Sequence, residues 1–161
     1  MHIRNYKKGI GLIEIIVAVF VLTIVLSALI TVNNLYIKSS SANIKMTQGA
    51  YLASEAVEAV KTIRDNGWAN ISAISIDTSY YLYFNSISSS WSATTTAESI
   101  PDFSRSFILK NVYRDQYGDI ASSGTLDSNI KRLEVSVSWH TSSGELVEKK
   151  ITTYIANILE E

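Results

Sequence analysis

A long apolar segment near the N-terminus constrains this chain more than any other feature. No charged residue occurs between Glu14 and Lys38. About 20 mostly apolar residues in a helix are enough to span the roughly 30 Å hydrocarbon core of a membrane. Residues 15–32 come close to this length alone, and residues 10–13 extend the segment. We therefore predict a membrane-spanning helix, followed by a region of different composition that is rich in Ser, Thr, Asn and Tyr.

A short basic segment precedes the apolar run and predicts its orientation. Lys7 and Lys8 lie directly before the run. Positively charged residues that flank a span tend to stay in the cytoplasm. We therefore predict a single pass through the inner (cytoplasmic) membrane, with the N-terminus in the cytoplasm and the residues after the span outside it.

Three kinds of N-terminal segment are compatible with this pattern. A secretory signal has an apolar core of about 7–15 residues followed by a small-residue cleavage site. The run here is longer, and the best small-residue site, Ser40-Ser41-Ala42, lies several residues beyond its end. An uncleaved signal anchor explains the hydropathy and the lysines but gives no role to Gly9 or Glu14. Cleavage after Gly9 gives a role to both residues.

Glu14 distinguishes between these alternatives. A carboxylate in the apolar part of a spanning helix costs about 2.5–3.5 kcal/mol at the membrane centre and less near an interface. In an uncleaved anchor Glu14 could reach the headgroups, but nothing would explain its presence. Cleavage between Gly9 and Ile10 would create an α-amino group one helical turn away, at a helix N-terminus that itself favours negative charge. Pairing with a neighbour's amine would then set the register of helices bundled in lipid.

The residues at this point resemble the class III signal of type IV prepilins and type II secretion pseudopilins. Lys7-Lys8-Gly9 is followed by Ile10-Gly11-Leu12-Ile13-Glu14 and an uninterrupted apolar helix. In that family, prepilin peptidase cuts after the Gly, the new N-terminus is methylated, and a Glu at the fifth mature position guides assembly. The resemblance implies cleavage between Gly9 and Ile10, methylation of Ile10, and an assembly role for Glu14.

The resemblance also implies partners and a structural function. The mature chain would be moved by the inner-membrane assembly machinery from the lipid bilayer into a helix bundle with other pilin subunits. That filament would lie on the cell surface or in the periplasm. A pilus, a type II secretion pseudopilus and a DNA-uptake system all remain open, although the acidic C-terminal region disfavours the last. An uncleaved, membrane-anchored binding domain outside the cytoplasm is the alternative function.

The departures from the family pattern favour a minor subunit. Ile10 stands where the family usually has Phe, and Gly11 stands where Thr is common. Many major pilins have a Pro near the position of Thr31, and this helix has none. A looser resemblance of residues 49–68 to minor pilins of the modification-protein type and to I-type pseudopilins points in the same direction.

A helical pattern returns after the span. Apolar or small residues at spacings of three and four form one stripe, which comprises Met46, Gly49, Leu52, Ala53, Ala56, Val60 and Ile63. Asn66-Gly67 is a suitable C-terminal stop, because both residues tolerate a left-handed cap. We predict an amphipathic helix over residues 34–66 that packs through this stripe, with residues 39–41 as a soft point where a linker could divide it.

The period of the pattern changes to two after Trp68. Leu133, Val135, Val137 and Trp139 alternate with polar residues, as in a half-buried strand. Residues 103–114 and 147–158 also read as strands, residues 80–84 as a shorter strand, and residues 86–99 as an exposed loop. We predict an antiparallel sheet of three or four strands packed on the outer half of the helix.

The predicted fold class is therefore α+β and pilin-like: a long N-terminal helix with a transmembrane first half, and a small antiparallel β-sheet head. Residues 1–9 would form a cleaved basic leader and residues 10–33 the transmembrane and assembly helix. Residues 34–66 would form the amphipathic helix and residues 67–161 the β-rich head. The aromatic residues Tyr80, Tyr81, Tyr83 and Trp91 could form a contact patch, although packing within the sheet would explain most of them.

The head shows no pattern typical of an enzyme. His140 has no second histidine nearby, and the chain has no cysteine. Asp115, Asp119, Asp127 and Asn129 flank a loop, and some pseudopilins bind calcium in that region, but the spacing matches no defined calcium loop. The formal net charge of −1 and the scattered basic residues argue against nucleic acid as the main partner. We predict a structural protein with no enzymatic activity and no cofactor.

Overall fold

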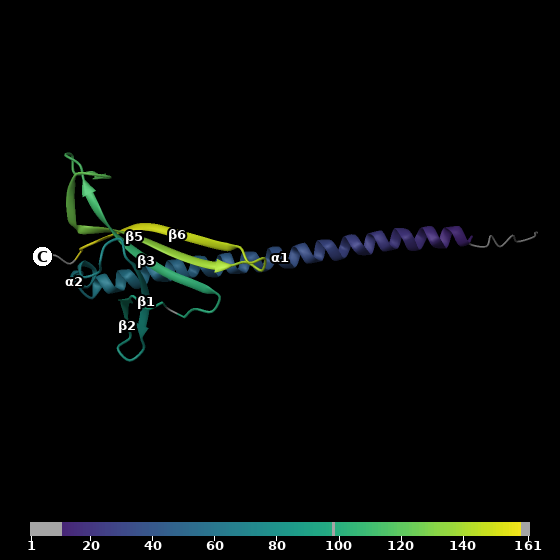
Figure 1. Ribbon diagram of the computed structural model, residues 1–161, viewed down its shortest axis with the longest axis horizontal. Coiled ribbons are helices and arrows are strands. Elements are labelled where there is room, and N and C mark those ends of the chain that lie inside the picture. Colours follow the sequence, from purple (N-terminus) through teal and green to yellow (C-terminus); the bar gives the residue numbers. More distant parts are fainter. Residues whose placement is uncertain (1–10, 98, 159–161) are drawn as a thin grey trace, which may run out of the picture. The chain divides into compact units, whose positions relative to one another are not determined.

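The computed structural model describes residues 11–97 and 99–158. The chain divides into two compact units, one up to Asn43 and one from Ile44 onwards. Helix α1 (Leu12–Asp65) accounts for nearly all of the described first unit and opens the second (Figure 1).

The first unit consists of helix α1 with every described side chain exposed. From Leu12 to Asn43 the helix contains neither proline nor glycine, so nothing interrupts its backbone hydrogen bonds. Residues 39–41 are helical as well. Serine has a lower helix propensity than alanine, but it does not break a helix that good helix formers flank. The alternative in which a linker divides the helix at this point is therefore not realised.

In the second unit, α1 ends where the sequence predicted. Gly67 donates a backbone hydrogen bond of 2.9 Å to the carbonyl oxygen of Arg64, and its φ of 128° favours glycine. The chain turns there into a short helix that we did not predict, α2 (Trp68–Ser72). Its one buried residue, Ile71, joins the core of the second unit.

The remainder of the second unit is an antiparallel sheet (Figure 1). The strand order is β2-β1-β3-β5-β6, and β4 pairs with β3. The strands are β1 (Ser79–Asn85), β2 (Ser90–Thr94), β3 (Phe103–Arg114), β4 (Ile120–Ala121), β5 (Thr125–His140) and β6 (Leu146–Ala156). The sheet therefore has six strands within the described residues, and the prediction of three or four was too low. The strands expected over residues 80–84, 103–114 and 147–158 correspond to β1, β3 and β6.

The segment expected to be an exposed loop contains strand β2, so that prediction was wrong for residues 90–94. Trp91 pairs with Phe84, and Ala93 pairs with Leu82. These contacts bury part of Trp91 and Ala93 against the core. The turn before them is closed by Asn85, whose side-chain oxygen accepts hydrogen bonds from the backbone of Ile87 and Ser88 at 2.9 and 3.3 Å. A local turn and a neighbouring strand therefore order a segment with few apolar residues.

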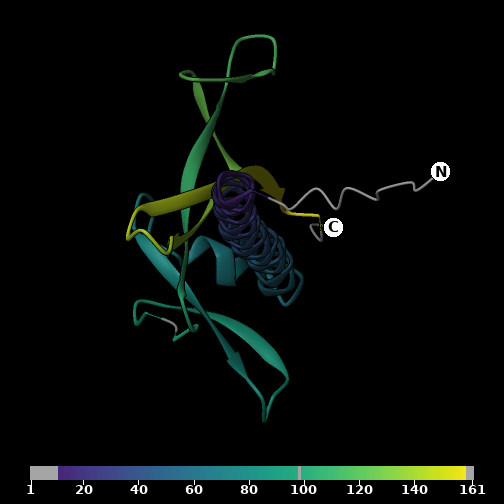
Figure 2. The same cartoon turned by 90° about the vertical axis from the view of Figure 1, so that its right-hand side faces the viewer.

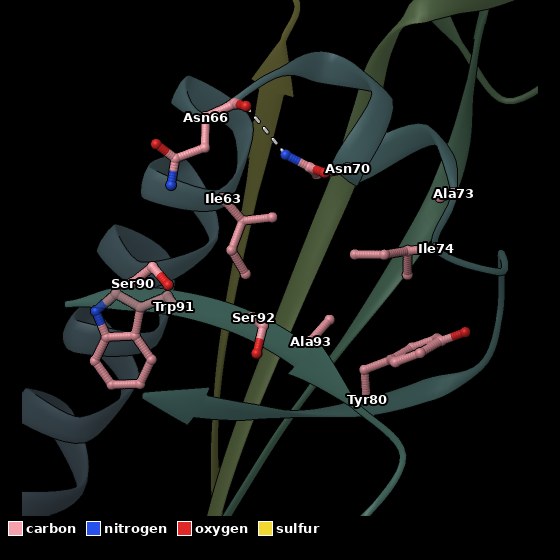
Figure 3. Close-up of a pocket in the computed structure, with 10 residues that line it drawn as sticks. All are labelled: Ile63, Asn66, Asn70, Ala73, Ile74, Tyr80, Ser90, Trp91, Ser92 and Ala93. Carbon is pink, nitrogen blue, oxygen red and sulfur yellow. Dashed lines mark hydrogen bonds between the residues drawn. The ribbon is translucent and has the colours of Figure 1, made fainter. Parts of the chain in front are cut away.

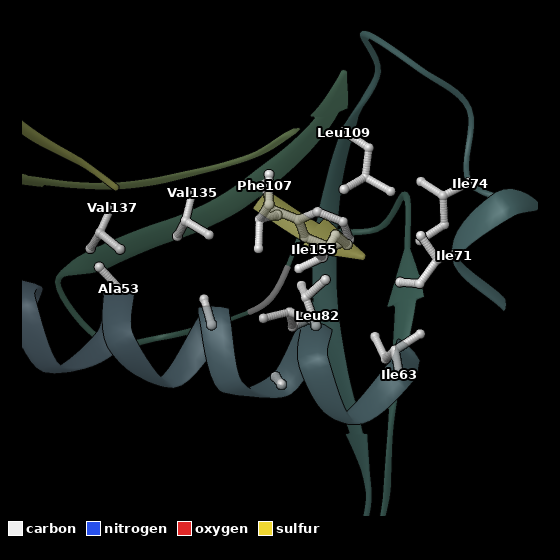
Figure 4. Close-up of a cluster of buried hydrophobic side chains, with 14 of the residues drawn as sticks. Ala53, Ile63, Ile71, Ile74, Leu82, Phe107, Leu109, Val135, Val137 and Ile155 are labelled. Carbon is white, nitrogen blue, oxygen red and sulfur yellow. The ribbon is translucent and has the colours of Figure 1, made fainter. Parts of the chain in front are cut away.

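The core of the second unit lies between one face of the sheet and α1 (Figure 4). The alternation predicted for β5 is confirmed, because Leu133, Val135, Val137 and Trp139 are all buried. On α1 the buried face comprises Gly49, Ala53, Ala56, Ala59, Val60 and Ile63. Met46 was wrongly placed in this face and is 53% exposed, Leu52 is only half-buried, and Ala59 was missed.

Small residues on the buried face let the helix and the sheet approach closely. A Cβ atom added at Gly49 would lie 2.6 Å from Cζ3 of Trp139, closer than real Cβ contacts allow. The residue after Trp139 in β5, His140, is exposed. The end of the sheet still reaches Lys45, one turn before Gly49, because Nζ of Lys45 donates a hydrogen bond of 3.2 Å to the carbonyl oxygen of His140.

Two hairpins extend from the central part of the sheet in opposite directions (Figure 2). One is the β1–β2 hairpin. The other is the far end of β3 and β5, which also carries β4. The β3–β5 pairing changes register between Asn111 and Val112, and such a bulge bends a strand and increases its local twist.

Candidate assembly segment

The first turn of α1 positions Glu14 at a helix N-terminus. The carbonyl oxygen of Gly11 accepts hydrogen bonds from the backbone N–H groups of Glu14 and Ile15 at 2.9 and 3.4 Å. Glu14 is exposed and is the acidic residue of the first turn. Because the first N–H groups of a helix lack partners within the helix, negative charge is favourable at this position. The carboxylate therefore lies where it could also meet an ammonium group.

The other predicted processing residues, Lys7, Lys8, Gly9 and Ile10, lie outside the described residues. Cleavage after Gly9 and methylation of Ile10 therefore stay predictions. The same holds for the pairing of Glu14 with an amine at Ile10.

The apolar part of α1 exposes hydrophobic side chains in every direction. From Leu12 to Val32 the exposed fraction of the large apolar residues runs from 49% at Val25 to 78% at Leu12. Of the described helices, α1 alone is long and apolar enough to cross a membrane. A helix that is apolar all round needs an apolar environment, supplied by lipid or by other helices.

Three hydroxyl groups in this segment are satisfied within the helix. Thr23 donates to the carbonyl oxygen of Val19 at 2.8 Å, Ser27 to that of Thr23 at 2.8 Å, and Thr31 to that of Ser27 at 3.0 Å. An unpaired hydroxyl in an apolar medium would cost about 2–7 kcal/mol. Sequence reasoning did not single out these residues, although their spacing of four is the signal for such bonds.

The head does not bring its predicted acidic residues together as a site. Asp115 accepts hydrogen bonds from the backbone N–H groups of Tyr117 and Asp119 at 2.8 and 3.0 Å. Asp127 accepts a hydrogen bond of 2.6 Å from Arg114, and this bond holds the pKa of the Asp127 carboxyl below its usual value. Within residues 11–97 and 99–158, no group of three or more His, Asp or Glu side chains is placed to hold a metal ion.

Sequence reasoning also missed a buried cation in the head. The guanidinium of Arg105 donates a hydrogen bond of 2.7 Å to Oε2 of Glu55, and its Cζ lies 5.8 Å from the ring centre of Trp91. These contacts join β3 to α1 and to β2. The available signal was the position of Arg105 in the alternation of β3, in phase with Phe107 and Leu109.

Comparison with known protein families gives one match, to the prokaryotic N-terminal methylation motif, over residues 4–30. The matched segment includes the basic residues, Gly9, Glu14 and most of the apolar run. Neither a curated protein nor a solved structure is significantly similar to the chain. The motif supports processing by prepilin peptidase, anchoring in a membrane and assembly with other pilins. The chain thus carries the class III signal typical of type IV pilins and pseudopilins, on an α+β fold of the pilin type.

Proposed function

We propose that this chain is a minor structural subunit of a type IV pilus or of a type II secretion-like pseudopilus. Prepilin peptidase cuts the precursor after Gly9, Ile10 is methylated, and the N-terminal helix enters a filament. One observation carries this proposal: Glu14, within a methylation motif, lies in the first turn of a helix whose first half is otherwise apolar.

The electrostatics of Glu14 favour assembly over simple anchoring. In an uncleaved anchor the carboxylate has no partner of its own and must reach water at the membrane surface. After cleavage each chain carries an α-amino group one helical turn from its own Glu14. An ion pair in an apolar medium is stabilising only when its geometry is good. A neighbouring helix shifted along the bundle axis would leave both charges unpaired. The free-energy cost of the unpaired charges would therefore favour one register.

The rest of the molecule fits this division of roles. Residues 10–33 supply the surface that packs first against lipid and then against other helices. Residues 34–66 and 67–161 lie outside the cytoplasm, where the sheet of the head and the second half of α1 share one core. In the filament the head is on the exterior or at the tip, on the cell surface or in the periplasm.

The unbroken helix supports a minor rather than a bulk role. Helix α1 has no proline, and the chain's one proline is Pro101 in the head. A helix without proline keeps its backbone hydrogen bonds and stays unkinked. Many major pilins carry a proline in the second half of the spanning helix, so this chain departs from the bulk-subunit pattern.

Mass spectrometry of the N-terminus of the membrane-purified protein tests the proposal. We expect a mature chain that begins at Ile10 and carries one methyl group on its α-nitrogen. In cells that lack prepilin peptidase, the same protein should keep its leader. An intact Met1 in cells with an active peptidase would identify the protein as an uncleaved membrane anchor and would overturn the proposal.

A further inference from the structure

The head contains a pocket of about 470 Å³ at the base of the β1–β2 hairpin (Figure 3). Its lining comes from the end of α1, from α2 and the residues after it, and from strands β1 and β2. Volumes of about 300–1,000 Å³ are usual for sites that take small molecules. The pocket belongs to the second unit alone and shares no residue with the assembly segment.

The lining carries no strong charge. None of the described residues that line the pocket is Asp, Glu, Lys, Arg or His. The neighbouring cation, Arg105, lies against the ring of Trp91 and is paired with Glu55 at 2.7 Å. A phosphate, carboxylate or ammonium ligand would lose hydration on entry without gaining an opposite charge. The pocket therefore suits a neutral ligand.

The polar groups of the lining both donate and accept hydrogen bonds. Asn66 and Asn70 present side-chain amides. The hydroxyls of Ser90 and Ser92 are already bonded, at 2.7 Å to that of Ser88 and at 3.4 Å to the carbonyl oxygen of Tyr83. A purely apolar ligand would cover the two amides without bonding to them, which is costly. A ligand rich in hydroxyl groups, which also donate and accept, would satisfy them.

Apolar and aromatic surface lies beside these polar groups. Ile63, Ile74 and Ala93 supply aliphatic surface, and Tyr80 and Trp91 supply rings (Figure 3). A pyranose ring combines hydroxyl groups at its edge with apolar C–H faces, so it matches both kinds of lining. A pocket of this size holds one or two such rings.

Several lining side chains are already held in place. The amide nitrogen of Asn70 donates a hydrogen bond of 3.2 Å to the carbonyl oxygen of Asn66. The ring of Trp91 lies 5.0 Å from that of Phe84 and is fixed on another side by the buried Arg105. Groups that are ordered before binding lose less entropy when a ligand arrives.

From this combination we propose that the pocket binds a neutral saccharide of one or two rings. The ligand could come from the glycans of another cell or from the wall of the cell that makes the protein. Both sources present neutral pyranose rings, but every ring of the wall backbone carries an acetamido group, whereas the glycans of other cells also contain unmodified hexoses. The proposal concerns the head alone and does not depend on filament assembly.

The test uses the full chain in phospholipid nanodiscs and isothermal titration calorimetry. The probes are lactose and maltose for unmodified hexoses, diacetylchitobiose for acetamido sugars, and galacturonic acid as a charged sugar. We expect binding of at least one neutral disaccharide, with a dissociation constant on the order of 1 mM for a ligand of this size. Binding of galacturonic acid should be at least about tenfold weaker. The neutral probe that binds identifies the source.

Two variants in the pocket and one matched control connect any binding to this site. Asn66→Ala removes one amide, and Ala93→Leu adds bulk to the lining from strand β2. Each should weaken saccharide binding by about tenfold or more. Ser86→Leu adds the same bulk to the same hairpin outside the lining and should leave binding unchanged. The indole N–H resonance of Trp91, assigned with Trp91→Phe, should shift on titration, whereas that of the buried Trp139 should not.

Three results would overturn the proposal. The first is the absence of binding by every neutral probe, and the second is tighter binding of the charged sugar. The third is neutral-sugar binding that Asn66→Ala and Ala93→Leu leave unchanged. If no saccharide binds but Ala93→Leu prevents filament incorporation, the pocket is a contact between subunits instead.

Discussion

The guanidinium of Arg105 on β3 donates a hydrogen bond of 2.7 Å to the carboxylate of Glu55 on α1. The side chain of Arg105 is 2% exposed, whereas that of Glu55 is 51% exposed. The buried member of the pair therefore depends on its partner more than the exposed member does. Removal of Glu55 takes a charge-assisted hydrogen bond away from a buried guanidinium.

Glu55→Ala should lower the free energy of unfolding of the head by about 1–3 kcal/mol, because hydrogen bonds to charged groups contribute on this scale. Unfolding of the full chain in detergent micelles by urea, followed by indole fluorescence, measures the change. The matched control is Glu58→Ala, which breaks an exposed pair with Lys61 of the same 2.7 Å length. That control should cost no more than about 0.5 kcal/mol. Equal costs for the two variants would contradict the role given to Arg105.

Gly49→Ala should also destabilise the head, by about 1–3 kcal/mol, since the new methyl group overlaps the indole of Trp139. Gln48→Ala, at the neighbouring exposed position, is the control for a change of helix propensity. The penalty of Gly49→Ala should shrink in a Trp139→Phe background, where the ring is smaller. A double-mutant cycle measures this coupling, and a penalty that is the same in both backgrounds would show that the indole is not the cause.

The pair Arg114–Asp127 predicts a specific pH dependence. The hydrogen bond from Arg114 lowers the pKa of Asp127 in the folded state, although partial burial acts in the opposite direction. A lowered pKa contributes stability above the unfolded pKa of about 3.9, and this contribution is lost as the pH falls through the folded value. Asp127→Asn should therefore be less stable than the parent chain at pH 7, and the difference should narrow below about pH 4. Urea unfolding at pH 7 and pH 3 measures both differences, and a gap that widens at low pH would have the wrong sign.

Glu14→Ala should leave membrane insertion and cleavage intact while abolishing incorporation into filaments. Membrane fractionation and mass spectrometry of the N-terminus check the first two properties, and analysis of sheared filaments checks the third. Glu14→Gln keeps the size and hydrogen-bonding capacity of the side chain but removes the charge, and it should fail in the same way. Normal incorporation of either variant would refute the pairing of Glu14 with an α-amino group.

The sequence was most informative where one local pattern decides the structure. The charge-free run forms part of α1, Asn66-Gly67 ends that helix, and β3 covers the residues read as a strand. Each of these features depends on period, on composition or on a stop signal within a few residues. Glu14 was chosen as a candidate assembly residue for a similar reason, because a carboxylate beside an apolar run is visible in the sequence alone.

The elements that sequence reasoning missed depend on partners distant in the chain. Strand β2 has few apolar residues and is ordered by pairing with β1. The partner of Arg105 lies fifty positions away in the chain. Met46 continues the helical stripe in the sequence, but its side chain is exposed in the fold. The pocket in the head combines residues from α1, α2, β1 and β2, so no pattern within a single segment could predict it.

The hydroxyls of Thr23, Ser27 and Thr31 do not tie the spanning helix to one environment. Each is already bonded to a carbonyl of its own helix, so none has to exchange one partner for another when the surroundings change from acyl chains to neighbouring subunits. Lipid and neighbouring helices therefore suit these three side chains about equally well. Under the proposed function, the preference for a neighbouring subunit over lipid then depends on the ion pair between Glu14 and an α-amino group.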